Sequence, residues 1–211
     1  MAADHAVVFV VDDDPSIREA LQDLIQSLDL DTRVFASPQE FLRAERPDAP
    51  ACLVLDVRLP GVSGLSFQQE LVKGGADLPV IFITGHGDVP MSVRAMKAGA
   101  IEFLSKPFRD EELIDAINVG IERSRAQRRE AARGAELRRR FAALTQRERE
   151  VMTLVISGRP NKRTAAELGV SEATVKVHRA QIMHKMQAKS LVDLVHMGDA
   201  LGLSTGKSQA T

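Results

Sequence analysis

The sequence has a single cysteine and no long apolar run. One thiol, Cys52, excludes an internal disulfide framework and a cysteine-rich zinc site. No stretch approaches the roughly 18 consecutive apolar residues that a membrane-spanning helix needs. The first residues, Met1 to His5, hold no basic segment ahead of a short apolar run, so no signal peptide is expected. These absences predict a cytoplasmic protein without a membrane partner.

Length and charge point to more than one role. At roughly 150 residues per domain, 211 residues predict one or two domains. Residues 1–121 carry 10 Lys and Arg against 20 Asp and Glu, whereas residues 122–211 carry 18 against 9. The basic second part suits a polyanion such as DNA. Two solvated surfaces of opposite charge would explain the same numbers.

The first 121 residues alternate short apolar runs with helical patterns. The five apolar runs are Ala6–Val11, Thr32–Phe35, Ala51–Leu55, Pro79–Ile83 and Ala100–Leu104. Each is short and rich in Val, Ile and Phe, which is typical of strands buried on both faces. At least 15 residues separate consecutive runs, enough for a crossover helix each time. The pattern predicts an α/β fold with a doubly wound parallel sheet.

Charged and hydroxyl side chains follow the predicted strands. Asp12, Asp13 and Asp14 follow the first strand, and Asp56 follows the third. The fourth strand ends at Thr84, and Ser105-Lys106-Pro107 ends the fifth. Ligands of open parallel sheets bind outside the carboxyl ends of the strands. We therefore expect a carboxylate cluster, a hydroxyl and an ammonium group to converge there.

Such a cluster suits Mg²⁺, which prefers oxygen ligands and bridges carboxylates to phosphate. A carboxylate beside this ion is a plausible phosphoryl acceptor, with the lysine and hydroxyl neutralising the transferred group. The alternative is that Asp12, Asp13 and Asp14 only cap the next helix. We prefer capping for Asp14, but capping alone leaves Asp56 and Lys106 unexplained.

These motifs resemble the receiver domain of two-component response regulators, and within it the FixJ subfamily, over about residues 5–121. The matching motifs are Val11-Asp12-Asp13-Asp14, Leu55-Asp56-Val57-Arg58-Leu59-Pro60-Gly61, Ile83-Thr84-Gly85-His86-Gly87-Asp88-Val89-Pro90-Met91, Ala95-Met96-Lys97-Ala98-Gly99-Ala100 and Lys106-Pro107. The resemblance implies a flavodoxin-like sheet with the strand order 2-1-3-4-5.

The resemblance also implies a role for each pocket residue. Asp56 would accept the phosphoryl group, and Asp13, the Asp56 carboxylate and the backbone carbonyl of Arg58 would bind Mg²⁺ directly. Asp12 would act on the metal through water. Thr84 and Lys106 would contact the phosphoryl oxygens, and the bond from Lys106 to Pro107 would be cis. Phe103 stands at the switch aromatic position, although a plain core residue is an equal interpretation.

A helical, arginine-rich linker is expected at residues 122–143. Eight arginines lie between Arg123 and Arg140, and the heptad positions are too mixed for a coiled coil. Gly134 interrupts this segment and is a possible point of bending. Residues 144–203 show only helical patterns, and residues 204–211 form a polar tail.

Residues 144–203 predict a helix-turn-helix. Thr145 and Glu148 form a capping box, Ser171 caps a later helix, and Gly169 lies in the short turn before it. Projected at about 100° per residue, the helix 172–186 has an inner stripe. The stripe contains Val175, His178, Ile182 and Met186. The opposite face is basic, amide-bearing and small, which suits the major groove of DNA.

This segment resembles the LuxR-type helix-turn-helix of NarL- and FixJ-type regulators over about residues 141–203. The matching residues are Leu144-Thr145, Arg147-Glu148-Arg149-Glu150-Val151, Asn161-Lys162 and Thr174-Val175-Lys176-Val177-His178-Arg179. By this resemblance Lys176, Val177 and Ala180 face base edges, whereas Lys162, Thr174 and Lys185 approach phosphates. The remaining expected DNA contacts are Asn161, Gln181 and His184.

We therefore expect a phosphorylation-dependent DNA-binding transcriptional regulator. Its partners would be a sensor histidine kinase, promoter DNA, RNA polymerase and a second copy after phosphorylation. It would be no enzyme beyond accepting and slowly losing its own phosphoryl group. A phosphohydrolase with an aspartate nucleophile is the enzymatic alternative. The motif typical of such enzymes is Asp-x-Asp-x-Thr/Val after the first strand, whereas the three aspartates here are followed by Pro15-Ser16, and no cap domain is present. A nucleotide-binding Rossmann domain would need a Gly-rich turn after the first strand, and this sequence has none. A receiver whose basic half binds RNA or protein is a further alternative.

Overall fold

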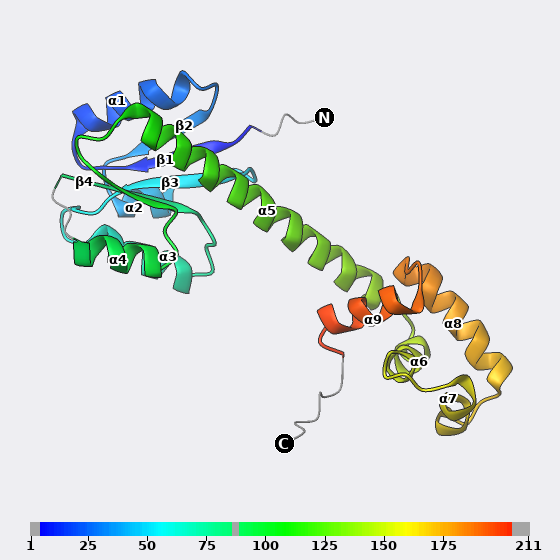
Figure 1. Cartoon of the computed structure of the whole chain (residues 1–211). Coiled ribbons are helices and arrows are strands. Elements are labelled where there is room, and N and C mark those ends of the chain that lie inside the picture. Colours follow the sequence, from blue (N-terminus) through cyan, green and yellow to red (C-terminus); the bar gives the residue numbers. More distant parts are fainter. Residues whose placement is uncertain (1–4, 86–88, 204–211) are drawn as a thin grey trace. The chain divides into compact units, whose positions relative to one another are not determined.

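The computed structural model describes residues 5–85 and 89–203 of the chain (Figure 1). Two compact units make up the chain: an N-terminal unit, Met1–Arg129, and a helical unit, Glu130–Thr211. The boundary between them falls inside the segment 122–143, for which the sequence predicts a linker. The predicted tail at 204–211, and residues 86–88 of the motif Ile83 to Met91, lie outside the described residues.

The N-terminal unit contains a five-stranded parallel sheet with the order β2-β1-β3-β4-β5. The strands are β1 Val7–Val11, β2 Asp31–Phe35, β3 Ala51–Asp56, β4 Val80–Thr84 and β5 Glu102–Ser105. Every residue of β1, β3 and β4 is buried, whereas the edge strands β2 and β5 are partly exposed. The predicted doubly wound sheet and its strand order are confirmed.

Helices cover both faces of this sheet (Figure 1). They are α1 Pro15–Gln26, α2 Pro38–Arg43, α3 Gly64–Lys73, α4 Val89–Lys97 and the first part of α5 Asp110–Ala142. Leu21 and Ile25 of α1 pack with Ile117 of α5 in one core. Phe41 of α2 and Phe67 of α3 pack in a second core on the other face. The alternating strand residues feed these two cores because their side chains point to opposite faces.

Cys52 lies fully buried in β3, where α5 crosses the sheet. A Cβ atom on Gly120 of α5 would lie 3.0 Å from the Cβ atom of Cys52, so a larger residue there would push helix and strand apart. Burial raises the pKa of the Cys52 thiol to about 12. The thiolate, which is the reactive form, is therefore scarce at neutral pH while the unit is folded.

Helix α5 remains attached to the N-terminal unit beyond residue 121, the predicted end of that domain. The Ser124 hydroxyl accepts a hydrogen bond from the backbone N–H of Ala51 at 3.0 Å. The Arg128 guanidinium pairs with Asp48 at 2.5 Å. The helix also runs through Gly134 without interruption.

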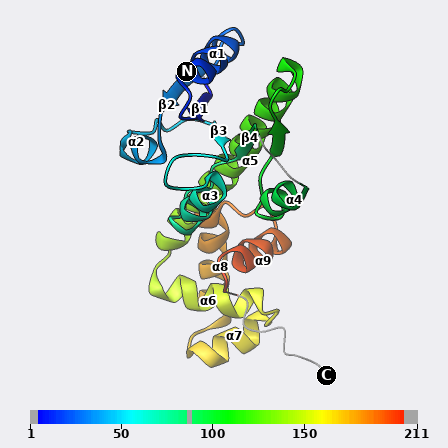
Figure 2. The same ribbon diagram turned by 90° about the vertical axis from the view of Figure 1, so that its left-hand side faces the viewer.

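The helical unit contains the end of α5 and four further helices (Figure 2). These are α6 Gln146–Ile156, α7 Asn161–Leu168, α8 Glu172–Met186 and α9 Leu191–Ala200. Val151, Val175 and Leu194 form part of its core, and Leu137 and Phe141 of α5 pack against that core. No strand occurs in the described part of this unit. The predicted all-helical second domain is confirmed.

Local signals in the sequence explain where several helices of this unit begin and end. Both hydrogen bonds of the predicted capping box between Thr145 and Glu148 are present at the start of α6. Ser171 caps α8, as predicted, and Gly169 ends α7 in the left-handed conformation. Glycine adopts that conformation without the steric penalty of a side chain. Across residues 5–85 and 89–203, no helix combines the length and apolar character that a membrane span requires.

Candidate functional site

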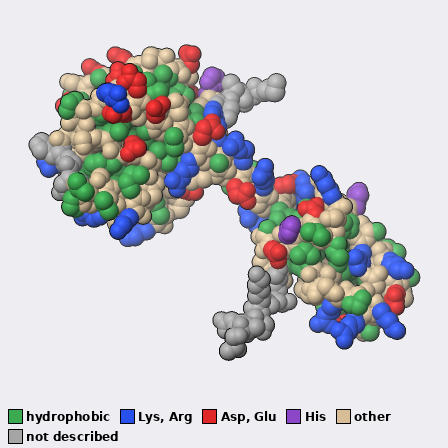
Figure 3. Space-filling model, in the orientation of Figure 1, with side chains coloured by type: hydrophobic (Ala, Val, Ile, Leu, Met, Phe, Trp, Pro, Cys, Tyr) green, Lys and Arg blue, Asp and Glu red, His purple; other side chains and the backbone are tan. Residues whose placement is uncertain are grey.

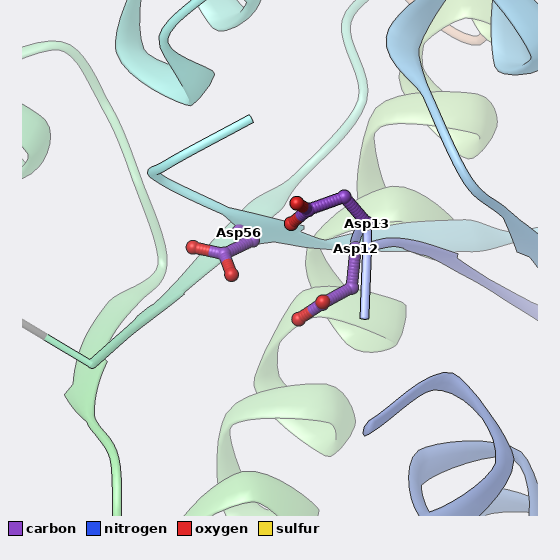
Figure 4. A group of neighbouring side chains, drawn as sticks. All are labelled: Asp12, Asp13 and Asp56. Carbon is purple, nitrogen blue, oxygen red and sulfur yellow. The ribbon is translucent and has the colours of Figure 1, made fainter. Parts of the chain in front are cut away.

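Three carboxylates come together at the carboxyl edge of the sheet (Figure 4). Asp12 and Asp13 follow β1, and Asp56 is the last residue of β3. One oxygen atom from each lies within 4.8 Å of the others. Asp12 is fully buried and Asp56 is 7% exposed, whereas Asp13 is exposed. The fold thus joins the three side chains that the sequence proposes as metal ligands, and Arg58 lies two residues beyond Asp56.

Lys106 reaches this cluster from the end of β5. Its Nζ atom lies 2.7 Å from Oδ2 of Asp12 and 3.1 Å from Oδ2 of Asp56. The peptide bond from Lys106 to Pro107 is cis, as the resemblance implies. With Asp13 close by, one ammonium group faces three carboxylates. The pocket therefore keeps a negative charge that a cation would neutralise.

The pKa of Asp56 is raised, and burial is the main cause. The backbone N–H of Arg58, 2.9 Å from Oδ1, and the Lys106 ammonium group lower this pKa without overcoming the effect of burial. For Lys106, burial lowers the pKa, but its bonds to Asp12 and Asp56 outweigh burial, so the net pKa is raised. Lys106 therefore stays protonated, whereas burial makes the ionised form of Asp56 less favourable than it is in water.

The loop after β1 is fixed by bonds that the sequence only partly predicts. The Asp14 side chain accepts from the N–H of Ser16 at 2.9 Å, so its predicted capping role is confirmed. The N–H of Asp14 donates to Oδ1 of Asp12 at 2.9 Å. Arg18 of α1 donates to the backbone carbonyl of Asp12 at 2.6 Å. Nothing in the spacing of Arg18 distinguishes it from a surface arginine, and sequence reasoning missed this contact.

Gly64, the first residue of α3, lies against the backbone of the pocket. A Cβ atom there would come within 2.4 Å of the carbonyl oxygen of Asp56. Its N–H donates to the carbonyl of Val57 at 2.9 Å. Only glycine allows this approach, which holds α3 against the end of β3. Sequence reasoning did not identify this residue either.

Thr84 and Phe103 lie on the two strands that complete the pocket edge. Thr84 is the last residue of β4 and is fully buried. Phe103 in β5 is half-buried, and its ring centroid lies 6.4 Å from that of Phe82. This packing suits both a core residue and a movable aromatic, so a switch role for Phe103 stays a prediction.

In the helical unit, α8 has a buried face and an exposed face. Val175, Ile182 and Met186 are buried, and His178 is half-buried beside them. The predicted DNA-contacting residues that lie exposed are Lys162, Lys176, Val177, Ala180, Gln181 and His184. In Figure 3, blue Lys and Arg side chains gather over the α7 and α8 part of the helical unit. Apart from Lys162, which lies on α7, these exposed positions are the ones that the helical projection of residues 172–186 predicts.

Three other predicted DNA contacts already have partners within the unit. The Asn161 side-chain carbonyl accepts from Arg179 at 2.7 Å. The Thr174 hydroxyl lies 2.8 Å from that of the capping serine of α8. The Nζ atom of Lys185 lies 2.7 Å from Oε2 of Glu148. By contrast, Lys162 and Lys176 form no ion pair within the described part of the chain.

Two family descriptions match the chain where these two sites lie. Residues 8–118 match the response regulator receiver domain, and residues 142–198 match the bacterial regulatory proteins of the luxR family. The chain belongs to the response regulators with a LuxR-type DNA-binding domain. In this family assignment the N-terminal unit is the receiver, and α6 to α9 form the DNA-binding domain.

Several relatives align with this chain over both of its domains. Nodulation protein W of Bradyrhizobium diazoefficiens is 52% identical over 211 residues, covering 100% of this chain and 92% of the relative. Transcriptional regulatory protein FixJ of Azorhizobium caulinodans is 45% identical over 93% of each chain. The solved structure of the response regulator StyR has a TM-score of 0.82 and 47% identity, covering 92% of this chain and 98% of that one.

This response regulator is therefore a phosphorylation-dependent regulator of transcription. A receiver domain implies a histidine kinase as partner, and a LuxR-type domain implies binding to DNA. Its family is one of regulators and not of classical enzymes. The predicted family, fold and general function are confirmed.

Proposed function

We propose that Asp56 accepts a phosphoryl group from a sensor histidine kinase and that the protein then binds promoter DNA through α8. The observation that carries this proposal is the Lys106 ammonium group held between two buried carboxylates beside the exposed Asp13. In the transfer, an Asp56 oxygen forms a bond to phosphorus. The bond from phosphorus to the donor histidine nitrogen breaks, and that nitrogen keeps the electron pair. Thr84 and Lys106 hold the phosphoryl oxygens.

Mg²⁺ fits the donor atoms of this pocket. The cluster of Asp12, Asp13 and Asp56 offers only oxygen ligands, which a hard divalent cation prefers. Asp13, the Asp56 carboxylate and the backbone carbonyl of Arg58 would hold the ion directly, and Asp12 through water. When bound, the ion neutralises charge on the acceptor and the transferred group. Hydrolysis of the protein's own aspartyl-phosphate would be slow, and no other reaction is proposed.

Acetyl phosphate tests the acceptor directly. With Mg²⁺ present, mass spectrometry should show one added phosphoryl group on the wild-type protein and none on Asp56→Asn. Asp13→Asn should abolish labelling at the Mg²⁺ concentration that saturates the wild type. Full labelling of Asp56→Asn would refute the assignment of the acceptor.

For DNA, we propose that Lys176, Val177 and Ala180 face base edges, with Gln181 and His184 on the same exposed face. Lys162 and Thr174 would approach phosphates, where the resemblance also places Lys185, and Asn161 would be a further contact to the DNA. Lys176→Ala should weaken binding to a selected operator by about 1–3 kcal/mol and change binding to random DNA much less. Lys162→Ala should weaken both and reduce the salt dependence. Equal losses for Lys176→Ala on both DNAs would make it a phosphate contact.

Phosphorylation is proposed to produce a homodimer that places two α8 helices on two half-sites. The exposed apolar side chains of α4 support a contact surface there: Val89 is 76% exposed, Val93 45% and Met96 44%. In Figure 3, green side chains gather over this part of the receiver. Light scattering should show a dimer with beryllofluoride, a phosphoryl mimic, and a monomer without it. We place this regulator in the cytoplasm, acting on RNA polymerase at its promoters.

A further inference from the structure

The last turn of α8 is held from outside the helix-turn-helix. Two basic side chains form the contacts, one at each side of that turn. Lys185 pairs with Glu148 of α6, and Arg140 of α5 donates from Nη1 to the backbone carbonyl of Met186 at 3.2 Å. Arg140 lies just outside the residues 142–198 that match the luxR family.

Lys185 is bound to a carboxylate that is already part of a helix cap. Oε2 of Glu148 lies 2.7 Å from the Lys185 ammonium group and also accepts the N–H of Thr145 at 2.7 Å. The Glu148 side chain is 2% exposed, whereas that of Lys185 is 35% exposed. If Lys185 turned toward a DNA phosphate, it would leave a buried carboxylate without its cation. Breaking such a pair is strongly unfavourable.

Arg140 is oriented in a similar way by a neighbour on its own helix. Its Nε atom lies 2.8 Å from Oε1 of Glu136, one turn earlier in α5. The guanidinium group then satisfies the carbonyl of Met186, one of the last four carbonyls of α8, which have no partner within the helix. Arg139 shares Glu136 but its side chain is 79% exposed, and within the described part of the chain no hydrogen bond or ion pair joins it to α8.

We propose that Arg140 and Lys185 are positioning residues that fix the last turn of α8 against the α5–α6 corner. Neither cation then contacts a phosphate. This inference rests on the proposed reading of DNA by α8. By this proposal, residues 136–141 of α5 contribute to DNA binding because they hold α8 in place. Base contacts need a more exact placement of the helix than phosphate contacts do. Loosening this turn should therefore weaken specific DNA binding more than non-specific DNA binding.

The acidic partners provide the sharpest test, because changing them leaves both cations in place. Full-length protein with beryllofluoride is titrated against DNA that it has selected from a random pool, and against unselected DNA, at several salt concentrations. Glu148→Gln and Glu136→Gln should each weaken binding to selected DNA about tenfold. Affinity for unselected DNA should change less than about threefold, and the salt dependence should stay that of the wild type. If the cations contact phosphates, releasing them from their acids should instead strengthen both affinities.

Two matched pairs of variants separate positioning from charge. Lys185→Gln is compared with Lys189→Gln, and Arg140→Gln with Arg139→Gln. The first member of each pair should lose specific affinity about tenfold, and the second should stay within about twofold. A fall of about 0.9 in the salt slope for Lys185→Gln or Arg140→Gln would overturn the proposal, because that is the signature of a lost phosphate contact.

A double variant keeps the test decisive if Lys185→Gln fails to fold. Glu148→Gln with Lys185→Met removes both charges and leaves no unpaired buried ion. Specific binding close to that of Glu148→Gln alone, with an unchanged salt slope, supports positioning, whereas a slope lowered by about 0.9 overturns it. Wild-type protein that selects no DNA sequence would refute the proposed function instead, which keeps the two failures apart.

Discussion

The receiver and the helical unit each bury a carboxylate, and the two differ in the direction of their pKa shift. Asp56 in the receiver has a raised pKa because burial outweighs its hydrogen bonds. Glu148 in the helical unit is also buried, which raises its pKa. Its bonds from Lys185 and from the N–H of Thr145, however, outweigh burial and leave the pKa lowered.

The difference matches the two proposed roles, Asp56 as the phosphoryl acceptor and Glu148 as the partner of a positioning residue. Asp56 shares the single Lys106 ammonium group with Asp12, so its charge stays undercompensated until a cation or a phosphoryl group arrives. Glu148 has Lys185 to itself and accepts the capping bond as well. The same kind of side chain thus has an undercompensated charge in one unit and an ion pair of its own in the other.

The largest effect should come from separating the Glu148 pair. Lys185→Met should lower the free energy of unfolding of the helical unit by about 3 kcal/mol at pH 7, because it leaves a buried charge without a partner. Since the folded pKa of Glu148 is lowered, its contribution is present above its ordinary pKa of 4.5 and is lost as pH falls through the folded pKa. Urea unfolding at several pH values measures this.

Lys189→Met is the matched control, because Lys189 is exposed and four residues away. It should change stability by less than about 0.5 kcal/mol. If both variants lowered the free energy of unfolding equally, the ion pair of Lys185 with Glu148 would not be the cause of the loss.

Removing the charge of Asp56 should increase stability, the opposite of the effect expected for Lys185→Met. Asp56→Asn should raise the urea midpoint of unfolding of the metal-free receiver at neutral pH, because it removes an undercompensated buried charge. The folded pKa of Asp56 is raised, so its stabilising contribution is full below the ordinary pKa of 3.8 and is lost as pH rises through the folded pKa. The gain from the substitution should therefore disappear below about pH 3.8. If Asp56→Asn were less stable than the wild type at pH 7, the charge of Asp56 would not be undercompensated, and its contrast with Glu148 would fail.

Thr164 of α7 is a buried polar residue of the helical unit that lacks such compensation. It is fully buried, and within the described part of the chain its hydroxyl has no hydrogen-bond partner. Thr164→Val should raise the melting temperature of the unit by an amount that corresponds to about 1 kcal/mol. Thr153→Val should not stabilise, because the Thr153 hydroxyl donates to the carbonyl of Arg149 at 3.0 Å.

The smallest effect should come from an exposed ion pair. Arg159 and Glu167 pair at the surface, where their side chains are 46% and 43% exposed. Arg159→Gln should change stability by less than about 0.5 kcal/mol, and high salt should remove even that difference. A loss comparable to that of Lys185→Met would show that burial does not decide the weight of these pairs.

Sequence periodicity predicted the elements that carry the chemistry. Alternating strands and crossover helices determine where strands end, and therefore why Asp12, Asp56 and Lys106 meet. Close approaches were not predictable in this way. Gly64 against Asp56 depends on the path of two backbones, which leaves no periodic signal.

Partners that lie far apart in the chain were missed for the same reason. The capping box of Glu148 was visible because its two residues are three apart, whereas Lys185 is 37 residues away. Helical projection placed Lys185 on the flank of α8 but could not show what lies beside that flank. The phosphate contact expected for Lys185 stays a prediction. The positioning role inferred above is the competing interpretation of the same residue.

Cys52 makes the receiver its own probe of unfolding. It is the single sulfhydryl in 211 residues, it is inaccessible in β3, and burial holds its pKa at about 12. A thiol reagent should therefore modify the protein only when the central sheet opens. Labelling in the presence of the kinase, Mg²⁺ or DNA would report the opening rate of the receiver while the helical unit stays silent. No engineered label is needed to follow one half of this protein in the presence of the other.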